Sequence, residues 1–328
     1  MPKVSILTPV YNGARYFGET LDSVRNQNFT DWEHIIVDDC SNDGTFNLFN
    51  DSTLKARWFI NSENLGEAKS VNRAYSEASG DYILILNSDD LVNANLLSKA
   101  VRILDANPSI DVVYPDWHMI DEHGDLIQEV ETSNYSRREL FESFVCIPGP
   151  GAVFRNHGLP QLRDPSYRWA GDYDQWLKMA KEDNFERIPE PLASWRKHTG
   201  AQTHQRGLEM ANERIRLIRN AFMRSNSSGL SRRNALSAAY YFAARLRFFD
   251  KKVPSFPWVL KSYFLRLRSP KGGTFRRPIP ITLLLIFPWV LEASLLVLNG
   301  VPSLRNLLEK ASSPTFVRRL NDALSNIE

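Results

Sequence analysis

The segment Gly80–Asp90, which reads GDYILILNSDD, joins an apolar run to two adjacent carboxylates. Residues 82–86 are all apolar or aromatic, and a run of this length is typical of a buried strand. Asp89 and Asp90 close the segment. A carboxylate at the rim of an apolar core is costly unless a helix N-terminus, an arginine or a metal ion compensates its charge. The partner of these two carboxylates therefore bears directly on function.

Two upstream segments have the same form. Residues 3–10 (KVSILTPV) and 32–39 (WEHIIVDD) are apolar runs that end in turn-forming or acidic residues. Apolar residues at helical spacing follow the first strand, over 15–27, and a third strand (56–62), over 64–78. Strands alternating with helices indicate an α/β domain with a parallel sheet and right-handed crossovers. The polar strand ends then meet at one edge, where such sheets bind their ligands.

The sequence lacks the two usual phosphate-binding loops. No G-x-G-x-x-G follows the first strand, and no G-x-x-x-x-G-K-[ST] occurs anywhere. If the sheet binds a phosphorylated ligand, another group has to meet its charge. A divalent cation held by the aspartates would do so, because hard cations take carboxylate and phosphate oxygens together.

Five segments together resemble the inverting family 2 glycosyltransferases, which have the GT-A fold. The resemblance covers roughly residues 3–204 and implies a mostly parallel α/β sheet flanked by helices, with a nucleotide-binding half (1–100) and an acceptor or catalytic half (101–204). It also implies a nucleotide-sugar donor, most often a UDP-sugar, and a divalent metal, Mn²⁺ or Mg²⁺. The segments are SILTPVYNG, HIIVDDCSNDGT, ENLGEAKSVNRA, LILNSDD and AGDYDQWLKMA.

The resemblance assigns roles to individual residues. It implies that Asp172 is the catalytic base and that Asp39 accepts a hydrogen bond from the uracil. It places Asp89, Asp90 and His198 at the metal and the diphosphate. The nucleotide-binding residues that it implies are Pro9, Tyr11, Asn12, Asp38, Asp39, Asn64, Gly66, Asn87, Ser88 and Asp89.

Three positions depart from the family pattern. Asn87 stands where the D-x-D triplet often has its first aspartate, Gly171 stands where a glutamate often precedes the base, and Val71 replaces an arginine. These departures leave an alternative, a non-catalytic nucleotide-sugar-binding or scaffold protein with a decayed GT-A site. Both acidic pairs and the candidate base remain, which favours the enzyme.

Local patterns leave two of the assignments open. Asp172 begins a helical segment and also fits a plain N-cap, with Gln175 completing a capping-box-like pair. Asp174 is the competing candidate for the base. His198 follows two basic residues and is either a structural histidine or a ligand of the metal or phosphate.

The charge is unevenly distributed along the 328 residues. Residues 1–204 carry 19 Lys and Arg against 31 Asp and Glu, whereas residues 205–328 carry 21 against 7. We expect 205–328 to be a basic helical region that faces an anionic partner. Its apolar segment 281–298 is short for a membrane span, and a span, an interfacial helix and a packed or dimer-forming helix all remain open. This segment argues against nucleic acid as the partner and favours an anionic membrane surface.

Cellular location follows from weaker signals. Two cysteines and a start without a signal-peptide pattern indicate a reducing compartment. The expectation is a cytoplasmic glycosyltransferase, peripheral at the inner face of the membrane, and a homodimer remains open. It would transfer sugar to a glycan or lipid-linked acceptor in surface polysaccharide or glycolipid synthesis.

Overall fold

The computed structural model describes residues 1–50, 56–145, 147–200, 207–224 and 229–250. The apolar segment 281–298 and the choice among its three interpretations lie outside the described residues. The strands are β1 (Val4–Val10), β2 (Trp32–Asp38), β3 (Ala56–Ile60), β4 (Tyr82–Ile85), β5 (Leu91–Val92), β6 (Val112–Ile120), β7 (Leu126–Val130), β8 (Val153–Arg155) and β9 (Phe185–Arg196). The helices are α1 (Phe17–Arg25), η1 (Thr45–Asn50, a 3₁₀ helix), α2 (Glu67–Ser76), α3 (Leu96–Ala106), α4 (Arg137–Ser143), α5 (Gly171–Met179), α6 (Gly207–Arg224) and α7 (Arg232–Asp250).

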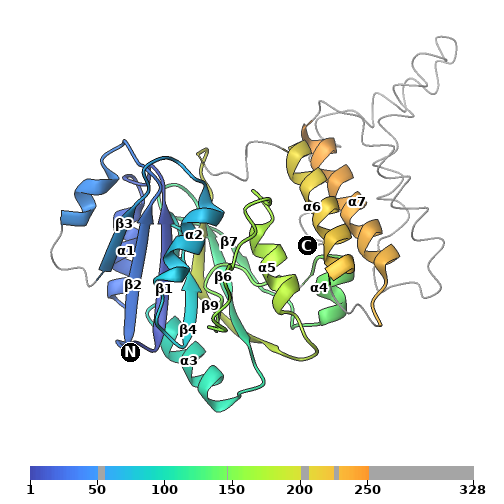
Figure 1. Ribbon diagram of the computed structural model, residues 1–328, viewed down its shortest axis with the longest axis horizontal. Helices are drawn as coiled ribbons and strands as arrows, with labels where there is room; N and C mark the ends of the chain where they lie inside the picture. The colour runs from blue at the N-terminus through green and yellow to red at the C-terminus, as the bar shows by residue number, and fades with distance from the viewer. Residues whose placement is uncertain (51–55, 146, 201–206, 225–228, 251–328) are drawn as a thin grey trace, which may run out of the picture.

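In the described part of the chain, nine strands form one sheet in the order β3-β2-β1-β4-β8-β6-β9-β5, with β7 paired to β6 (Figure 1). The strands β1 to β4 pair in parallel. The strand β8 runs antiparallel to both β4 and β6, so β6 and its parallel partner β9 point the same way as β1. The predicted α/β fold class is confirmed, with a parallel first half and a mixed second half.

The strand order places the ligand-binding edge. The chain passes from β1 to β2 and β3 on one side of the sheet, and β4 then pairs with the other side of β1. Such a reversal opens a crevice at the carboxyl ends of the strands on either side of it. Because β1, β2, β4, β6 and β9 all point the same way, their carboxyl ends share one edge, which we call the carboxyl edge.

Helices cover both faces of the sheet. All seven residues of β1 are buried, as expected for a strand covered on both sides. Alternate residues face opposite ways. Ile6 belongs to the cluster that includes Leu97 of α3, whereas Leu7 belongs to the cluster that includes Val71 of α2. The domain is therefore a three-layer sandwich of helices, sheet and helices.

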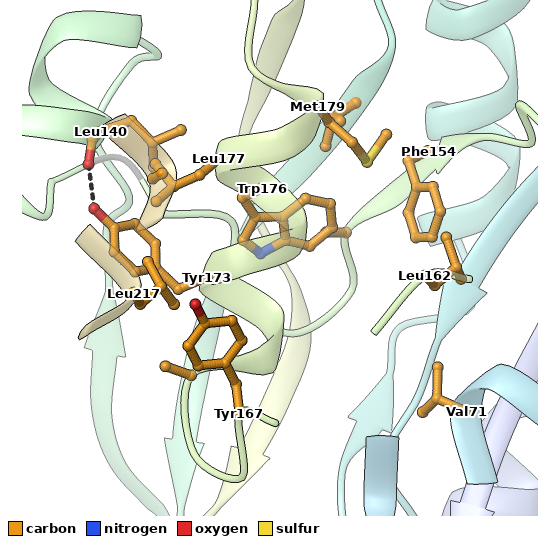
Figure 2. Packing of buried hydrophobic residues seen from close by; sticks show 14 of the residues in the cluster. Val71, Leu140, Phe154, Leu162, Tyr167, Tyr173, Trp176, Leu177, Met179 and Leu217 are labelled. Atoms are coloured by element: carbon orange, nitrogen blue, oxygen red, sulfur yellow. Dashed lines mark hydrogen bonds between the residues drawn. The ribbon is translucent and has the colours of Figure 1, made fainter. Parts of the chain in front are cut away.

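The helix α6 packs into the same core. Figure 2 shows Tyr173 and Trp176 of α5 among apolar neighbours that include Leu217 of α6, and the Tyr173 hydroxyl donates to the Leu140 carbonyl at 2.6 Å. Figure 1 shows α6 and α7 side by side next to α4 and α5. Residues 207–250, although part of the basic region, thus contribute to the packing behind α5. Among the described residues, no helix is long and apolar enough to cross a membrane.

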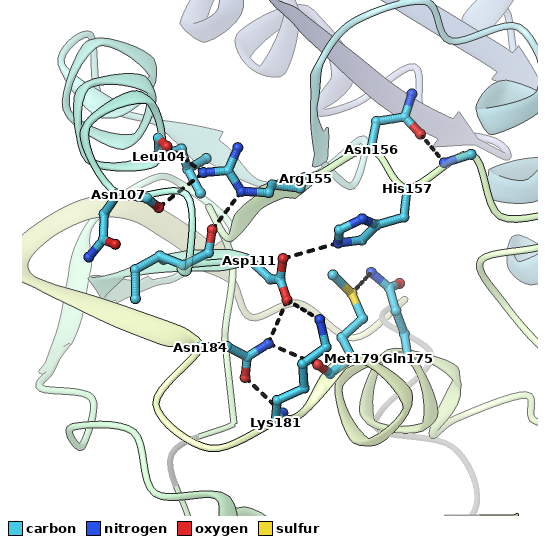
Figure 3. Close-up of polar contacts among 12 residues, drawn as sticks. Leu104, Asn107, Asp111, Arg155, Asn156, His157, Gln175, Met179, Lys181 and Asn184 are labelled. Atoms are coloured by element: carbon cyan, nitrogen blue, oxygen red, sulfur yellow. Dashed lines mark hydrogen bonds and ion pairs between the residues drawn. The ribbon is translucent and has the colours of Figure 1, made fainter.

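A polar network at the opposite edge is structural. The Asp111 carboxylate accepts hydrogen bonds from Asn184 and Lys181, both at 2.9 Å, and lies 3.1 Å from His157 (Figure 3). Burial alone would raise the pKa of Asp111, but the hydrogen bonds from Lys181 and Asn184 lower it below its ordinary value. Asp111 precedes β6 and Asn184 precedes β9, so the network joins the amino ends of two parallel strands, away from the carboxyl edge.

Candidate functional site

The loops after β1 and β2 interlock at the carboxyl edge. The Asn12 N–H donates to the Ser41 hydroxyl at 2.8 Å, and the Asn12 side-chain carbonyl accepts the Asn42 N–H at 2.9 Å. Asn12 has φ of 50°, a left-handed conformation that asparagine tolerates better than most residues. Asp38 is buried and accepts the Ser41 N–H at 3.0 Å. Asp38 therefore orders the loop that holds Asn12.

Asp39 is almost surrounded by donors. One carboxylate oxygen accepts from the Asn61 amide at 2.7 Å and the Leu65 N–H at 2.8 Å, and the other accepts the Gly66 N–H at 2.7 Å. A carboxylate offers about four acceptor sites, so about one remains on the second oxygen. Gly66 has φ of 88°, a conformation in which a side chain would be strained.

Two exposed apolar residues lie next to or within the backbone that holds Asp39, which is itself 3% exposed. Tyr11 is 49% exposed beside the Asn12 turn, and Leu65, which donates to Asp39, is 36% exposed. Asn64 is exposed as well, whereas Pro9 is buried within β1. Exposed apolar and aromatic faces next to a single free acceptor suit a flat heterocycle that carries an N–H donor.

Asp90 is held by protein donors on both oxygens. One oxygen accepts the Arg196 N–H at 3.0 Å, and the other accepts the Asn87 side-chain amide at 3.0 Å. The residue is 2% exposed. Burial raises the pKa of the Asp90 carboxyl well above its ordinary value, and the neighbouring Asp89 charge raises it further. We therefore leave Asp90 out of the proposed ligand set and treat it as an anchor for β9.

Asp89 lies against His198. The two side chains are 2.9 Å apart, from the carboxylate oxygen to Nε2, and the His198 ring packs against Tyr16 with centroids 4.8 Å apart. The antiparallel pairing of β5 with β9, Leu91 opposite Ser194, brings the two segments together. This pairing joins residues 109 positions apart in the sequence.

These two side chains fit a divalent cation. Within the described ranges, no group of three or more His, Cys, Asp and Glu residues gathers as a metal site. Two protein ligands are nevertheless enough where substrate phosphates complete the coordination, as is usual for Mg²⁺. Mn²⁺ accepts carboxylate oxygen readily, and imidazole nitrogen is a common ligand of divalent transition metals. Asp89 and His198 thus match the expected Mn²⁺ or Mg²⁺ if a diphosphate supplies the remaining oxygens.

Arg196 is a buried residue that the sequence analysis did not single out. Its side chain is 0% exposed, donates to the Asp89 carbonyl at 3.0 Å and pairs with Glu19 at 2.7 Å. Its guanidinium lies 4.8 Å from the Tyr16 ring centroid. It therefore links the end of β9 to α1 and to the Asp89 backbone. The available signal was an arginine two positions before His198.

The start of α5 separates the two base candidates. Asp172 is exposed in the first turn, and one of its oxygens accepts the Tyr173 N–H at 2.7 Å. The N-cap is Ala170, so the interpretation of Asp172 as the N-cap is wrong. Asp174 is buried and forms ion pairs with Lys178 and Arg224. Of the two carboxylates, only that of Asp172 is accessible to a substrate.

A carboxylate from α6 binds the backbone N–H groups just before α5, as a capping side chain does. Glu213 accepts the backbone N–H groups of Arg168, Trp169 and Ala170 at 2.8, 2.7 and 2.8 Å. These three groups immediately precede α5, so Glu213 fixes the approach to Asp172. No local sequence pattern predicts this contact, because Glu213 is more than 40 positions away from Ala170.

Arg163 lies close to Gly171, one of the positions that depart from the family pattern. A side chain at Gly171 would begin 3.6 Å from the buried Arg163, whose guanidinium lies 3.8 Å from Glu67 at the start of α2. Because α2 starts just beyond the carboxyl end of β3, this contact brings the start of α5, and with it Asp172, to the carboxyl edge. Val71 is fully buried, so no side chain at position 71 supplies a charge to this edge.

Known proteins resemble this chain in both sequence and structure. The family model described as "Glycosyl transferase family 2" matches residues 5–158. TuaG of Bacillus subtilis, which bears the name "Putative teichuronic acid biosynthesis glycosyltransferase", is 37% identical over 190 residues, which are 55% of this chain and 73% of TuaG.

Two solved structures share the fold. Residues 1–349 of S. aureus TarS in complex with UDP-GlcNAc match with a TM-score of 0.61 at 20% identity, over 88% of this chain and 87% of that chain. The mannosyltransferase PcManGT of Pyrobaculum calidifontis, in complex with GDP-Man and Mn²⁺, matches with a TM-score of 0.53 at 19% identity, over 88% and 86%. At these identities the likeness concerns the fold alone.

Proposed function

This chain belongs to glycosyl transferase family 2, and from that membership we propose that it transfers a sugar from a UDP-sugar to an acceptor hydroxyl with inversion at the anomeric carbon. The observation that carries the proposal is the approach of Asp89 to His198 at the edge that also holds Asp39. Asp172 lies exposed at the start of α5, which Arg163 links to the same edge.

Asp39 and its surroundings support the choice of donor. The one remaining acceptor site on Asp39 suits a base that presents a ring N–H, as uracil does. Tyr11 and Leu65 are exposed, and we expect their side chains to pack against the base. Because the Leu65 and Gly66 N–H groups hold the carboxylate, its orientation is set before the donor binds.

Asp89 and His198 would hold Mn²⁺ or Mg²⁺ together with the donor diphosphate. When bound, the cation would neutralise the negative charge that the leaving diphosphate gains. The protein's part is to keep the two ligands in place. Arg196 does so through the Asp89 carbonyl, and Asp90 through the Arg196 N–H.

Asp172 would act as the general base. The Tyr173 N–H occupies one carboxylate oxygen, and no described residue donates to the other. That free oxygen would take the proton of the acceptor hydroxyl. The hydroxyl oxygen then forms a bond to the anomeric carbon, and the bond from that carbon to the diphosphate oxygen breaks, releasing UDP. A single displacement of this kind inverts the anomeric centre.

A donor screen tests the proposed function. The full chain would be incubated with UDP-, GDP- and dTDP-sugars and Mn²⁺, and binding and release of nucleoside diphosphate would be measured with candidate glycan acceptors. We expect UDP-sugars to bind best and to be turned over. Binding without any turnover would favour the alternative of a non-catalytic nucleotide-sugar-binding protein, and absence of all nucleotide binding would refute the proposal.

We further place the enzyme at an anionic membrane surface, acting on a surface polysaccharide or lipid-linked glycan. The basic composition of residues 205–328 and the name of TuaG support this location and this acceptor class. Basic residues near an anionic surface contribute about 1 kcal/mol each and are screened by salt, whereas apolar contact is not.

Vesicle flotation measures this association. We expect the full chain to float with vesicles that contain anionic lipid and to stay bound in high salt, and a variant lacking residues 281–298 to be released by salt. A full chain that ignores anionic vesicles and is a dimer without detergent would contradict the membrane location and favour a dimer contact.

A further inference from the structure

Arg214 of α6 lies in an aromatic cage and has no counter-ion in the described structure. Its guanidinium carbon lies 4.3 Å from the ring centroid of Phe242 and 5.7 Å from those of Phe144 and Tyr173. Its Nε is buried without a hydrogen-bond partner. Among the residues that the structure describes, Arg214 forms neither a hydrogen bond nor an ion pair.

A buried guanidinium without a counter-ion or hydrogen-bond acceptor is unfavourable in free energy. Taking a charged group out of water is costly unless it is paired and hydrogen-bonded. Cation–π contacts offset only part of this cost and leave the N–H donors unused. Burial lowers the pKa of Arg214 from its ordinary value, and the nearby Asp172 charge opposes that shift. An anion that accepts the guanidinium N–H groups would complete the site.

The neighbouring groups on α6 do not supply this anion. Glu213 is adjacent in sequence, but three backbone N–H groups before α5 already occupy its carboxylate. Two other arginines of α6 have partners, since Arg216 donates to the Ser166 carbonyl and Arg219 donates to the Tyr240 hydroxyl. Arg214 therefore differs from the other two in having an aromatic cage and unused donors.

The position of Arg214 indicates what the anion belongs to. The cage includes Tyr173, which directly follows the candidate base, and the charge of Asp172 acts on Arg214. Asp172 would repel an anionic acceptor that has to approach it closely. A guanidinium that is close enough for the Asp172 charge to act on it would offset that repulsion, and its planar fork matches a carboxylate or a phosphate in two-point contact.

We propose that Arg214 binds an anionic group of the acceptor, a uronate carboxylate or a phosphodiester, next to the hydroxyl that Asp172 deprotonates. This assignment rests on the proposed function and adds the acceptor class to it. It makes α6, which lies beyond the residues 3–204 that resemble the family in sequence, a part of the acceptor site. Acceptors without charge near the reacting hydroxyl would then bind weakly.

Binding of defined probes tests the assignment. The full chain, loaded with UDP and Mn²⁺, would be titrated with a uronate-containing oligosaccharide, its carboxyl-reduced neutral counterpart and a glycerol phosphate oligomer. The variants are Arg214→Gln, Arg214→Lys and, as a matched control, Arg102→Gln at an exposed position of α3.

The unmodified chain should prefer one anionic probe to the neutral one, and the preferred probe distinguishes carboxylate from phosphate. Arg214→Gln should weaken that probe about 10- to 100-fold, the range for charged hydrogen bonds, with UDP affinity and neutral-probe binding unchanged. Arg214→Lys should recover part of the loss, and Arg102→Gln should lose nothing.

Other results would overturn the assignment. Equal anionic binding by Arg214→Gln and the unmodified chain would do so, as would no anionic preference in the unmodified chain. If Arg214→Gln does not fold, as judged by its melting temperature, Arg214→Lys decides, because unweakened binding of the anionic probe despite the lost two-point fork would count against the assignment. Failure of the unmodified chain to bind UDP would instead remove the proposed function itself.

Discussion

Replacing Asp172 by asparagine is expected to lower kcat for sugar transfer by about 10²- to 10⁴-fold, the usual contribution of a general base, with donor affinity unchanged. Asparagine keeps the shape of the side chain and can still accept the Tyr173 N–H. The variant should also fold, because Glu213 and not Asp172 holds the backbone before α5. Steady-state transfer kinetics together with UDP-sugar binding measure the two effects separately.

Asp174→Asn is the matched control, since it makes the same chemical change two residues away. The Asp174 side chain is 3% exposed and pairs with Lys178 and Arg224, so we expect this variant to lower the melting temperature more than kcat. If Asp174→Asn abolishes transfer while Asp172→Asn turns over normally, the base has been assigned to the wrong carboxylate.

Asp89→Asn and His198→Ala are expected to remove the cation-dependent part of UDP binding. We expect a loss of at least about tenfold, because even residues that only orient metal ligands typically contribute 10- to 100-fold to metal affinity. Chelator should weaken UDP binding to the unmodified chain to a similar degree and should have little further effect on either variant. Calorimetric titration with UDP, with and without Mn²⁺, gives these values.

Asp81→Asn provides the control for loss of charge. Asp81 immediately precedes β4, whereas Asp89 follows it, so the two changes remove the same charge from opposite ends of one strand. Asp81 pairs with Lys3 at the surface, and its replacement should leave UDP binding unaltered. Equal UDP affinity of the unmodified chain with and without chelator would rule out a cation held by Asp89 and His198.

The sequence alone was sufficient for the fold class and for the edge at which the candidate site residues meet. Short apolar runs such as residues 82–86 are typical of buried strands in the interior of a sheet. Helices between successive strands act as crossover connections, so the strands run in parallel. Turn-forming and acidic residues after three such runs therefore had to meet at one edge. The pairing of β1 with β2 and β4 in parallel confirms this inference.

Only the tertiary structure distinguished residues with the same local pattern. Asp89 and Asp90 are adjacent, yet the first faces His198 and the second is held by the Arg196 N–H, because the pairing of β5 with β9 sets which side chain points where. Local spacing likewise did not separate Asp172 from Asp174, since burial against distant cations decides which carboxylate is accessible.

For the same reason, the sequence could not predict the contacts of Arg163, Glu213 and Arg214. Each acts on a backbone or side chain from another element, across 40 to about 100 positions in the chain. Periodicity reports which face of an element is buried, because that depends on neighbours a few residues away. It does not report which polar groups meet across elements, because strand register and helix packing in the folded chain set those distances.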